Sequence, residues 1–95
     1  MIGRISKGYQ KDLAITATAV SLTVPAGSKG AVIRVISEDI IFTEDGSTPT
    51  SSNGLPAYSG ETVEYLDADY EFVLSKWSAI RMGGVNASVS VAYYR

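Results

Sequence analysis

Apolar and polar residues alternate with a period of two along much of the chain. In Ala19–Val24 the apolar positions 20, 22 and 24 alternate with Ser and Thr, and a Pro-Ala-Gly sequence ends the run. The same alternation marks Glu61–Leu66, Asp69–Leu74 and Asn86–Tyr94. It is typical of strands with one face in a core and the other in water. We therefore predict four β-strands at these positions.

Other segments carry weaker or different patterns. Gly30–Ser37 is apolar at most positions around Arg34, which predicts a central strand covered on both faces. A short strand over Asp39–Thr43 and a weaker one over Tyr9–Thr16 are also expected. Ser75–Ile80 has Trp and Ile three residues apart, so we expect a single helical turn or an irregular edge segment there.

Turn-forming residues separate these segments and indicate the fold class. Pro-Ala-Gly-Ser-Lys-Gly at 25–30 joins two strands, and Leu66–Asp69 is a short polar connection that predicts a hairpin. Short strands at spacings of about 8–12 residues, without a helical period, are typical of sandwiches and small barrels. We predict an all-β fold, a single small β-sandwich or jelly-roll-like barrel of about seven to eight short antiparallel strands.

Residues Glu44–Gly60 interrupt the β pattern with a segment rich in turn-forming residues. It has no charge after its first two residues and contains two of the three prolines. Compact domains rarely keep connections longer than about 12–15 residues unless these bind something or are disordered. Leu55, Pro56 and Tyr58 are therefore candidate contacts for a partner. A second interpretation has Leu55 and Tyr58 folding back to cap the protein's own core.

The beginning of the chain has a different character from the rest. We divide the chain into an N-terminal arm or edge strand at 1–16 and a β-sandwich domain at 17–95, with the long loop 44–60. The charged residues of Met1–Asp12 are mainly basic, and two of them, Arg4 and Lys7, are candidate partner-binding residues. Chain ends that are not tied down are usually mobile, so we expect this arm to become ordered on a partner.

Composition excludes several function classes. The 95 residues include eight basic and ten acidic residues, so the net charge of −2 disfavours binding to nucleic acid. The chain has no cysteine and no histidine, which removes thiolate sites and the commonest general base and metal ligand. No apolar run approaches the roughly 20 residues of a membrane span. We expect a non-enzymatic protein with no cofactor, no catalytic residue and no membrane partner.

Two residue clusters nevertheless suggest chemistry. Asp67, Asp69 and Glu71 could bind Ca²⁺ or, as a carboxylate pair, hydrolyse a glycoside; otherwise they build a turn and a solvated strand face. Aromatic side chains could form a platform for stacking sugars, or they could fill the core of a small domain. These aromatic residues are Tyr58, Tyr65, Trp77, Tyr93 and Tyr94.

Several short motifs resemble small virion proteins of tailed bacteriophages. The resemblance covers roughly residues 17–95 and leaves 1–16 unmatched, and residues 67–72 are longer than the usual equivalent. The motifs are Val24-Pro-Ala-Gly27, Asp45-Gly-Ser-Thr-Pro-Thr50, Gly54, Gly60-Glu61, Leu74-Ser75 with Ile80, and Tyr93-Tyr94. The resemblance implies a β-rich virion component, made in the host cytoplasm, of the capsid decoration or auxiliary head type. It implies no catalytic residue.

Two function classes follow. The first is a structural protein that binds a major capsid or other virion protein, with its own copies in a homo-oligomer as a further partner. The second is a host-recognition or carbohydrate-binding module associated with a tail fibre. Co-sedimentation with empty capsids distinguishes the first from the second, which predicts binding to host cells or glycans.

Overall fold

Eight strands and one short helix follow one another along the chain in the computed structural model, which describes residues 6–65 and 71–95. All but one of these elements are β-strands, so the predicted all-β class is confirmed. The elements are β1 (Ser6–Ile15), β2 (Val20–Ser21), β3 (Gly30–Ser37), β4 (Ile40–Thr43), β5 (Leu55–Ala57), β6 (Thr62–Tyr65), α1 (Glu71–Lys76), β7 (Ser78–Arg81) and β8 (Ala87–Tyr94).

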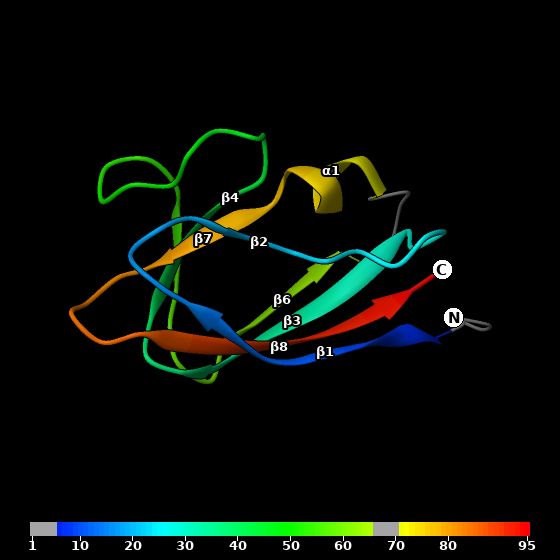
Figure 1. Cartoon of the computed structure of the whole chain (residues 1–95), viewed down its shortest axis with the longest axis horizontal. Helices are drawn as coiled ribbons and strands as arrows, with labels where there is room; N and C mark the ends of the chain where they lie inside the picture. Colours follow the sequence, from blue (N-terminus) through cyan, green and yellow to red (C-terminus); the bar gives the residue numbers. More distant parts are fainter. Residues whose placement is uncertain (1–5, 66–70) are drawn as a thin grey trace.

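The strands form two antiparallel sheets of four strands each. The first sheet has the order β1-β8-β3-β6, and the second has the order β2-β7-β4-β5. Figure 1 shows the two sheets as separate layers, with β1, β8 and β3 together in the lower part of the view. The protein is therefore a β-sandwich, in which β1 and β6 are the edges of one sheet and β2 and β5 the edges of the other.

The core lies between the sheets and follows from the alternation of the longest strands. In β8, Ala87, Val89, Val91 and Tyr93 are buried, while the residues between them are half-buried on the outer face. Strand β3 contributes Ala31, Ile33 and Val35 in the same way, and the second sheet contributes Ile40, Phe42, Ala57 and Ala79. Full burial of each large apolar side chain stabilises the fold by roughly 1.5–3 kcal/mol.

Helix α1 and the residue after it add two buried side chains to the core, including the bulkiest one. Leu74 lies in the helix and Trp77 directly follows it, and both are buried. The Trp77 ring stacks on Phe42 of β4, with ring centroids 5.8 Å apart. In Figure 1 the helix lies above β3 and β6. A six-residue helix gains little from its own hydrogen bonds, so this packing stabilises it.

The predicted strand over Asp69–Leu74 is wrong, because residues 71–76 form α1. Alternating apolar residues suggested a strand, but Leu74 and Trp77 are three residues apart and face the core together from one side of a helical turn. The helical turn expected in Ser75–Ile80 is present only at its start. The rest of that segment belongs to β7, an inner strand between β2 and β4. The predicted hairpin turn at Leu66–Asp69 lies outside the described residues.

Strand β3 is central in its sheet but is not covered on both faces as predicted. It pairs with β8 on one side and β6 on the other. Its outer face carries Arg34, which is exposed, and Ile36, which is 46% exposed. A two-layer sandwich has only one buried face per sheet, so the apolar run of β3 reaches solvent at Ile36.

The N-terminal segment is an edge strand over most of its length. Strand β1 pairs with β8 from Ser6↔Tyr94 to Ile15↔Ala87, with irregularities between Ser6 and Gly8 and between Gln10 and Leu13. The expectation of a mobile arm is therefore wrong for residues 6–12, whereas the alternative of an edge strand describes them. Residues 1–5 lie outside the described part of the chain.

Two further predicted boundaries change. The strand expected over Ala19–Val24 is only two residues long, although Leu22 and Val24 still pack against the core. The long loop is not one irregular segment, because β5 lies inside it and pairs with β4. Residues 44–60 are therefore the connection from β4 to β5, the edge strand itself, and a turn that leads to β6.

Candidate binding surface

Strand β5 carries the sequence-predicted contact residues to one edge of the second sheet. Leu55 pairs with Phe42 and Pro56 with Ile41, and Tyr58 directly follows the strand. We call Leu55, Pro56 and Tyr58 the β5 edge surface. Because β5 pairs with β4 and is the last strand of its sheet within residues 6–65 and 71–95, this surface lies at the margin of the sandwich.

The large apolar residues of the β5 edge surface are exposed. Leu55 is 56% exposed and Tyr58 is 49% exposed, whereas Ala57 between them is buried. Ala57 therefore anchors the strand to the core, while its larger neighbours reach solvent. The alternative in which Leu55 and Tyr58 cap the protein's own core does not fit these exposed fractions.

Pro56 determines how this edge can be contacted. Proline has no backbone N–H to donate, and within sheets it is found mainly on edge strands for that reason. Pro56 occupies the middle of β5 and is exposed. A partner strand could not form a complete hydrogen-bonded ladder along three residues with proline at their centre. Contact through side chains is the mode that fits this edge.

Gly54 brings the start of β5 close to β4. It has a φ of +134°, and a Cβ atom there would lie 2.7 Å from Ile41 Cγ2 and 2.8 Å from the Phe42 carbonyl oxygen. Residues with a side chain rarely adopt this conformation, and the Phe42 backbone could not move aside easily. The glycine is therefore needed to hold Leu55 beside Phe42.

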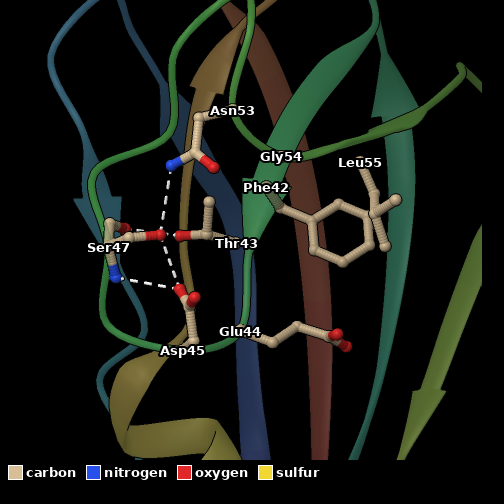
Figure 2. Close-up of a pocket in the computed structure, with 8 residues that line it drawn as sticks. All are labelled: Phe42, Thr43, Glu44, Asp45, Ser47, Asn53, Gly54 and Leu55. Atoms are coloured by element: carbon tan, nitrogen blue, oxygen red, sulfur yellow. Dashed lines mark hydrogen bonds between the residues drawn. The ribbon is translucent and has the colours of Figure 1, made fainter.

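Hydrogen bonds fold the preceding turn into a defined shape, which Figure 2 shows together with Phe42 and Leu55. Thr43 Oγ1 donates to the Ser47 carbonyl at 2.6 Å. Asn53 Nδ2 donates to Ser47 Oγ at 3.1 Å and to the Thr48 carbonyl at 3.0 Å. Thr50 and Asn53 also exchange two backbone hydrogen bonds. A turn held in this way loses little conformational entropy when a partner binds.

The carboxylate of Asp45 takes part in the same network. The Ser47 hydroxyl and the Ser47 backbone N–H both donate to Asp45 Oδ1. These hydrogen bonds hold the pKa of Asp45 below its ordinary value, because they favour the charged carboxylate. The neighbouring Glu44 accepts a hydrogen bond from the Tyr65 hydroxyl and, in Figure 2, points away from Asp45.

A cavity of about 200 Å³ lies between this turn and β5. Phe42 and Leu55 form its apolar side, and Asp45, Ser47 and Asn53 form its polar side. The three polar side chains bond to one another or to the turn's backbone. We therefore interpret the cavity as part of the hydrogen-bonded turn that holds the β5 edge surface in place.

The turn after β5 is fixed in the same manner. The backbone N–H of Tyr58 donates to Glu61 Oε1, and the Glu61 N–H donates back to the Tyr58 carbonyl. The Ser59 N–H donates to Asp39 Oδ1 at 2.8 Å, and the Gly60 N–H donates to the Val35 carbonyl at 2.8 Å. Tyr58 thus projects from a turn that is tied to the β3–β4 connection.

Lys7, one of the two basic residues predicted as partner contacts, does not join this surface. Lys7 is half-buried on β1, and its Nζ lies by the turn at Gly27. Strands β1 and β5 are edges of different sheets, and each is joined by a short turn to the edge strand of the other sheet, β1 to β2 and β5 to β6. They therefore lie at opposite sides of the sandwich. Arg4 lies outside the described residues.

The acidic cluster that could bind a metal ion falls mainly on residues outside the described part of the chain. Asp67, Asp69 and the side chain of Glu71 lie outside the described residues. Among the residues that the structure describes, no group of three side chains suited to a metal ion occurs. Within the same residues, no helix is long and apolar enough to cross a membrane.

Of the two interpretations of the aromatic residues, the core interpretation holds for three of them and the sugar-stacking platform is not formed. Tyr65, Trp77 and Tyr93 are at most 5% exposed and belong to the core, so they offer no face to a sugar ring. Tyr93 donates its hydroxyl proton to Gln10 Oε1 at 2.7 Å, and burial raises its pKa to about 12. Of the five aromatic residues, Tyr58 and Tyr94 retain solvent contact.

The structure also brings together residues that the sequence reasoning did not single out. Tyr9 and Lys11 of the β1 segment line a second cavity together with Val32, Arg34 and Ala92 on the outer face of the first sheet. The signal available in the sequence was the set of positions that alternate with the inward residues of each strand. Without the strand order, that set does not show which positions are neighbours.

No family model, no curated protein and no solved structure matches this chain.

Proposed function

We propose that the protein is a non-enzymatic structural component of a tailed-phage virion that attaches to the capsid lattice, as a decoration or auxiliary head protein does. Its attachment site is the β5 edge surface. The motifs that resemble phage virion proteins support the proposal, since the Asp45–Thr50 motif and Gly54 build the turn that positions Leu55.

The observation that carries the proposal is the exposure of Leu55 and Tyr58 on backbone that is rigidly held. Apolar side chains on a preorganised edge gain from burial without a large ordering cost. The contact involves few residues, so each site is weak alone. A capsid lattice offers many equivalent sites. If neighbouring copies of the protein also contact one another, their many weak contacts add up to a higher overall affinity.

The alternative function, a carbohydrate-binding module of a tail fibre, has less support. Sugar binding by stacking needs exposed aromatic faces, and three of the five candidate rings are buried. Tyr58 alone remains at the β5 edge surface.

The test is co-sedimentation of the purified protein with empty capsids of the phage whose genome encodes it. The unaltered protein is expected to sediment with the capsids and to saturate at a fixed ratio to the capsid subunit. The double variant Leu55→Ser/Tyr58→Ser is expected to lose at least tenfold in affinity, because it removes two apolar anchors. Its melting temperature should stay close to that of the unaltered protein, since both side chains are exposed.

Met82→Ser/Val85→Ser is the matched control. Met82 and Val85 are 37% and 62% exposed in the β7–β8 connection, so the control removes a similar apolar surface elsewhere. It should bind capsids normally. Equal loss of binding by both double variants would contradict the assignment of the β5 edge surface. Absence of binding by the unaltered protein would contradict the proposed function itself.

A further inference from the structure

A cavity of about 270 Å³ opens on the outer face of the first sheet. Its lining comes from three adjacent strands: Tyr9, Lys11 and Asp12 from β1, Ser90 and Ala92 from β8, and Val32 and Arg34 from β3. This face lies on the other side of the first sheet from the core, and β1 lies at the side of the sandwich opposite β5. We call this hollow the β8 groove.

The strand register explains why the face is hollow there. Ala92 lies opposite Tyr9 on one side and opposite Val32 on the other, and Ser90 lies opposite Arg34. The middle strand therefore presents small side chains, while both flanking strands carry long ones. Strands β1 and β3 are two strand spacings apart, about 9–10 Å, which is wide enough for one extended chain between their side chains.

An irregularity in β1 shapes one wall of the groove. Between Gln10 and Leu13 the pairing with β8 shifts, and Asp12 adopts a φ of +53°. The Asp12 backbone N–H turns to Ser90 Oγ, 3.3 Å away. Bulges of this kind re-aim side chains. Here the shift places Lys11 and Asp12 in the same lining as Tyr9.

The groove has two cationic side chains on opposite walls. Lys11 and Arg34 are both exposed, and neither forms an ion pair or a side-chain hydrogen bond within residues 6–65 and 71–95. Asp12 is the one carboxylate in the lining, so the formal charge there is +1 on a chain whose net charge is −2. Tyr9, 68% exposed, adds a large uncovered ring.

We propose that the β8 groove binds an extended acidic peptide segment of a partner protein. A carboxylate of the segment would lie between Lys11 and Arg34, and an apolar part would cover Tyr9, Val32 and Ala92. Charge complementarity favours an acidic partner over a basic one. Nucleic acid fits less well, because tracking successive phosphates needs a longer row of cations.

The inference goes beyond the proposed function and does not rest on it. The β8 groove and the β5 edge surface share no residue and belong to different sheets. A protein with both surfaces could hold two partners at once.

The test uses the ¹⁵N-labelled protein and a peptide of four Glu-Thr repeats, titrated by NMR at low ionic strength. Amide shifts are expected around Tyr9, Arg34 and Ala92, with an affinity that falls as salt is added, because exposed ion pairs are screened. Lys11→Gln/Arg34→Gln should weaken binding roughly tenfold, about threefold for each exposed pair removed. Asp12→Asn should strengthen binding two- to threefold, because it removes the one carboxylate of the lining. The substitution should be tolerated, since asparagine also adopts a positive φ.

Lys76→Gln/Arg81→Gln is the matched control, because it changes the net charge equally but lies in α1 and β7. It should leave the affinity unchanged, and the melting temperature of each variant shows whether it is folded. Three results would overturn the proposal: no shifts in the groove at millimolar peptide, equal binding of a Lys-Thr repeat, or equal weakening by the two double variants. Tighter binding of an eight-nucleotide deoxythymidine strand would identify nucleic acid as the partner instead.

Discussion

At the scale of single residues, the β5 edge surface depends on a glycine that has no exposed role of its own. Gly54 combines a φ of +134° with close approach to the Phe42 carbonyl and to Ile41. The hydrogen bonds of Ser47 and Asn53 fold the turn, and Gly54 then lets the chain lie against β4. Leu55 and Tyr58 would contact a partner, but their positions are set by these neighbours.

Gly54→Ala is therefore expected to destabilise the protein by roughly 2–4 kcal/mol, because a methyl group there meets backbone as well as an unfavourable φ. Urea unfolding measures the change. Gly83→Ala is the control, since Gly83 has no positive φ and open space around it, and its effect should stay within about 0.5 kcal/mol. Similar unfolding free energies for the two variants would show that β5 does not need the close approach at Gly54.

Tyr93 gives the protein a dependence on alkaline pH. Its pKa is about 12 in the folded protein, above the ordinary value of 10.0, because burial disfavours the phenolate. Because the pKa is higher in the folded protein, the unfolded state loses the phenol proton of Tyr93 at a lower pH than the folded state does. The contribution of Tyr93 to stability is thus fully present below pH 10 and is lost as pH rises toward 12.

Unfolding free energies of the unaltered protein and of Tyr93→Phe, measured from pH 8 to pH 12, test this. The difference in unfolding free energy between the unaltered protein and Tyr93→Phe should be constant up to about pH 10. Above that pH it should shrink, because tyrosine ionises and phenylalanine does not. The other tyrosines titrate in both proteins and cancel in the comparison. An advantage that is the same at pH 8 and pH 12 would contradict the burial of the Tyr93 hydroxyl.

At the scale of elements, β8 was predictable because alternation over eight residues is a strong signal, and β3 was predictable because its residues are apolar at most positions around Arg34. Helix α1 was not, because its six residues are too few to display a helical period, and the alternating apolar positions 70, 72 and 74 imitated a strand. The short strand β5 contains a proline at its centre, which lowered its strand signal. Both elements form through tertiary contacts, with Trp77 against Phe42 and Gly54 against β4.

Strand β1 supplies the clearest test at this scale. Removing residues 1–10 deletes half of β1, its pairing with Tyr94 to Val91, and the Gln10 acceptor of the Tyr93 hydroxyl. The melting temperature should fall by roughly 10–20 °C, equivalent to a few kcal/mol in a domain of this size. Removing residues 1–5, which precede β1, gives the reference chain. If the longer deletion left the melting temperature unchanged, residues 6–10 would not be needed for the stability of the fold.

At the scale of the whole molecule, two surfaces of different character lie on different sheets of one sandwich. The β5 edge surface is apolar and uncharged, whereas the β8 groove carries two cationic side chains and an exposed tyrosine. The sequence showed the first through Leu55, Pro56 and Tyr58, because they interrupt a polar segment. It could not show the second, because Tyr9, Arg34 and Ala92 become neighbours only through the order β1-β8-β3.

The measurement that tests the central claim most directly is the protein composition of purified phage particles. Particles of the phage that encodes this chain are banded on a density gradient, heads are separated from tails, and each fraction is quantified by mass spectrometry. We expect the protein in the head fraction at a fixed and high copy number relative to the major capsid protein. Its absence from the particles, or its presence in tails alone, would contradict the proposal that it is a capsid-bound structural protein.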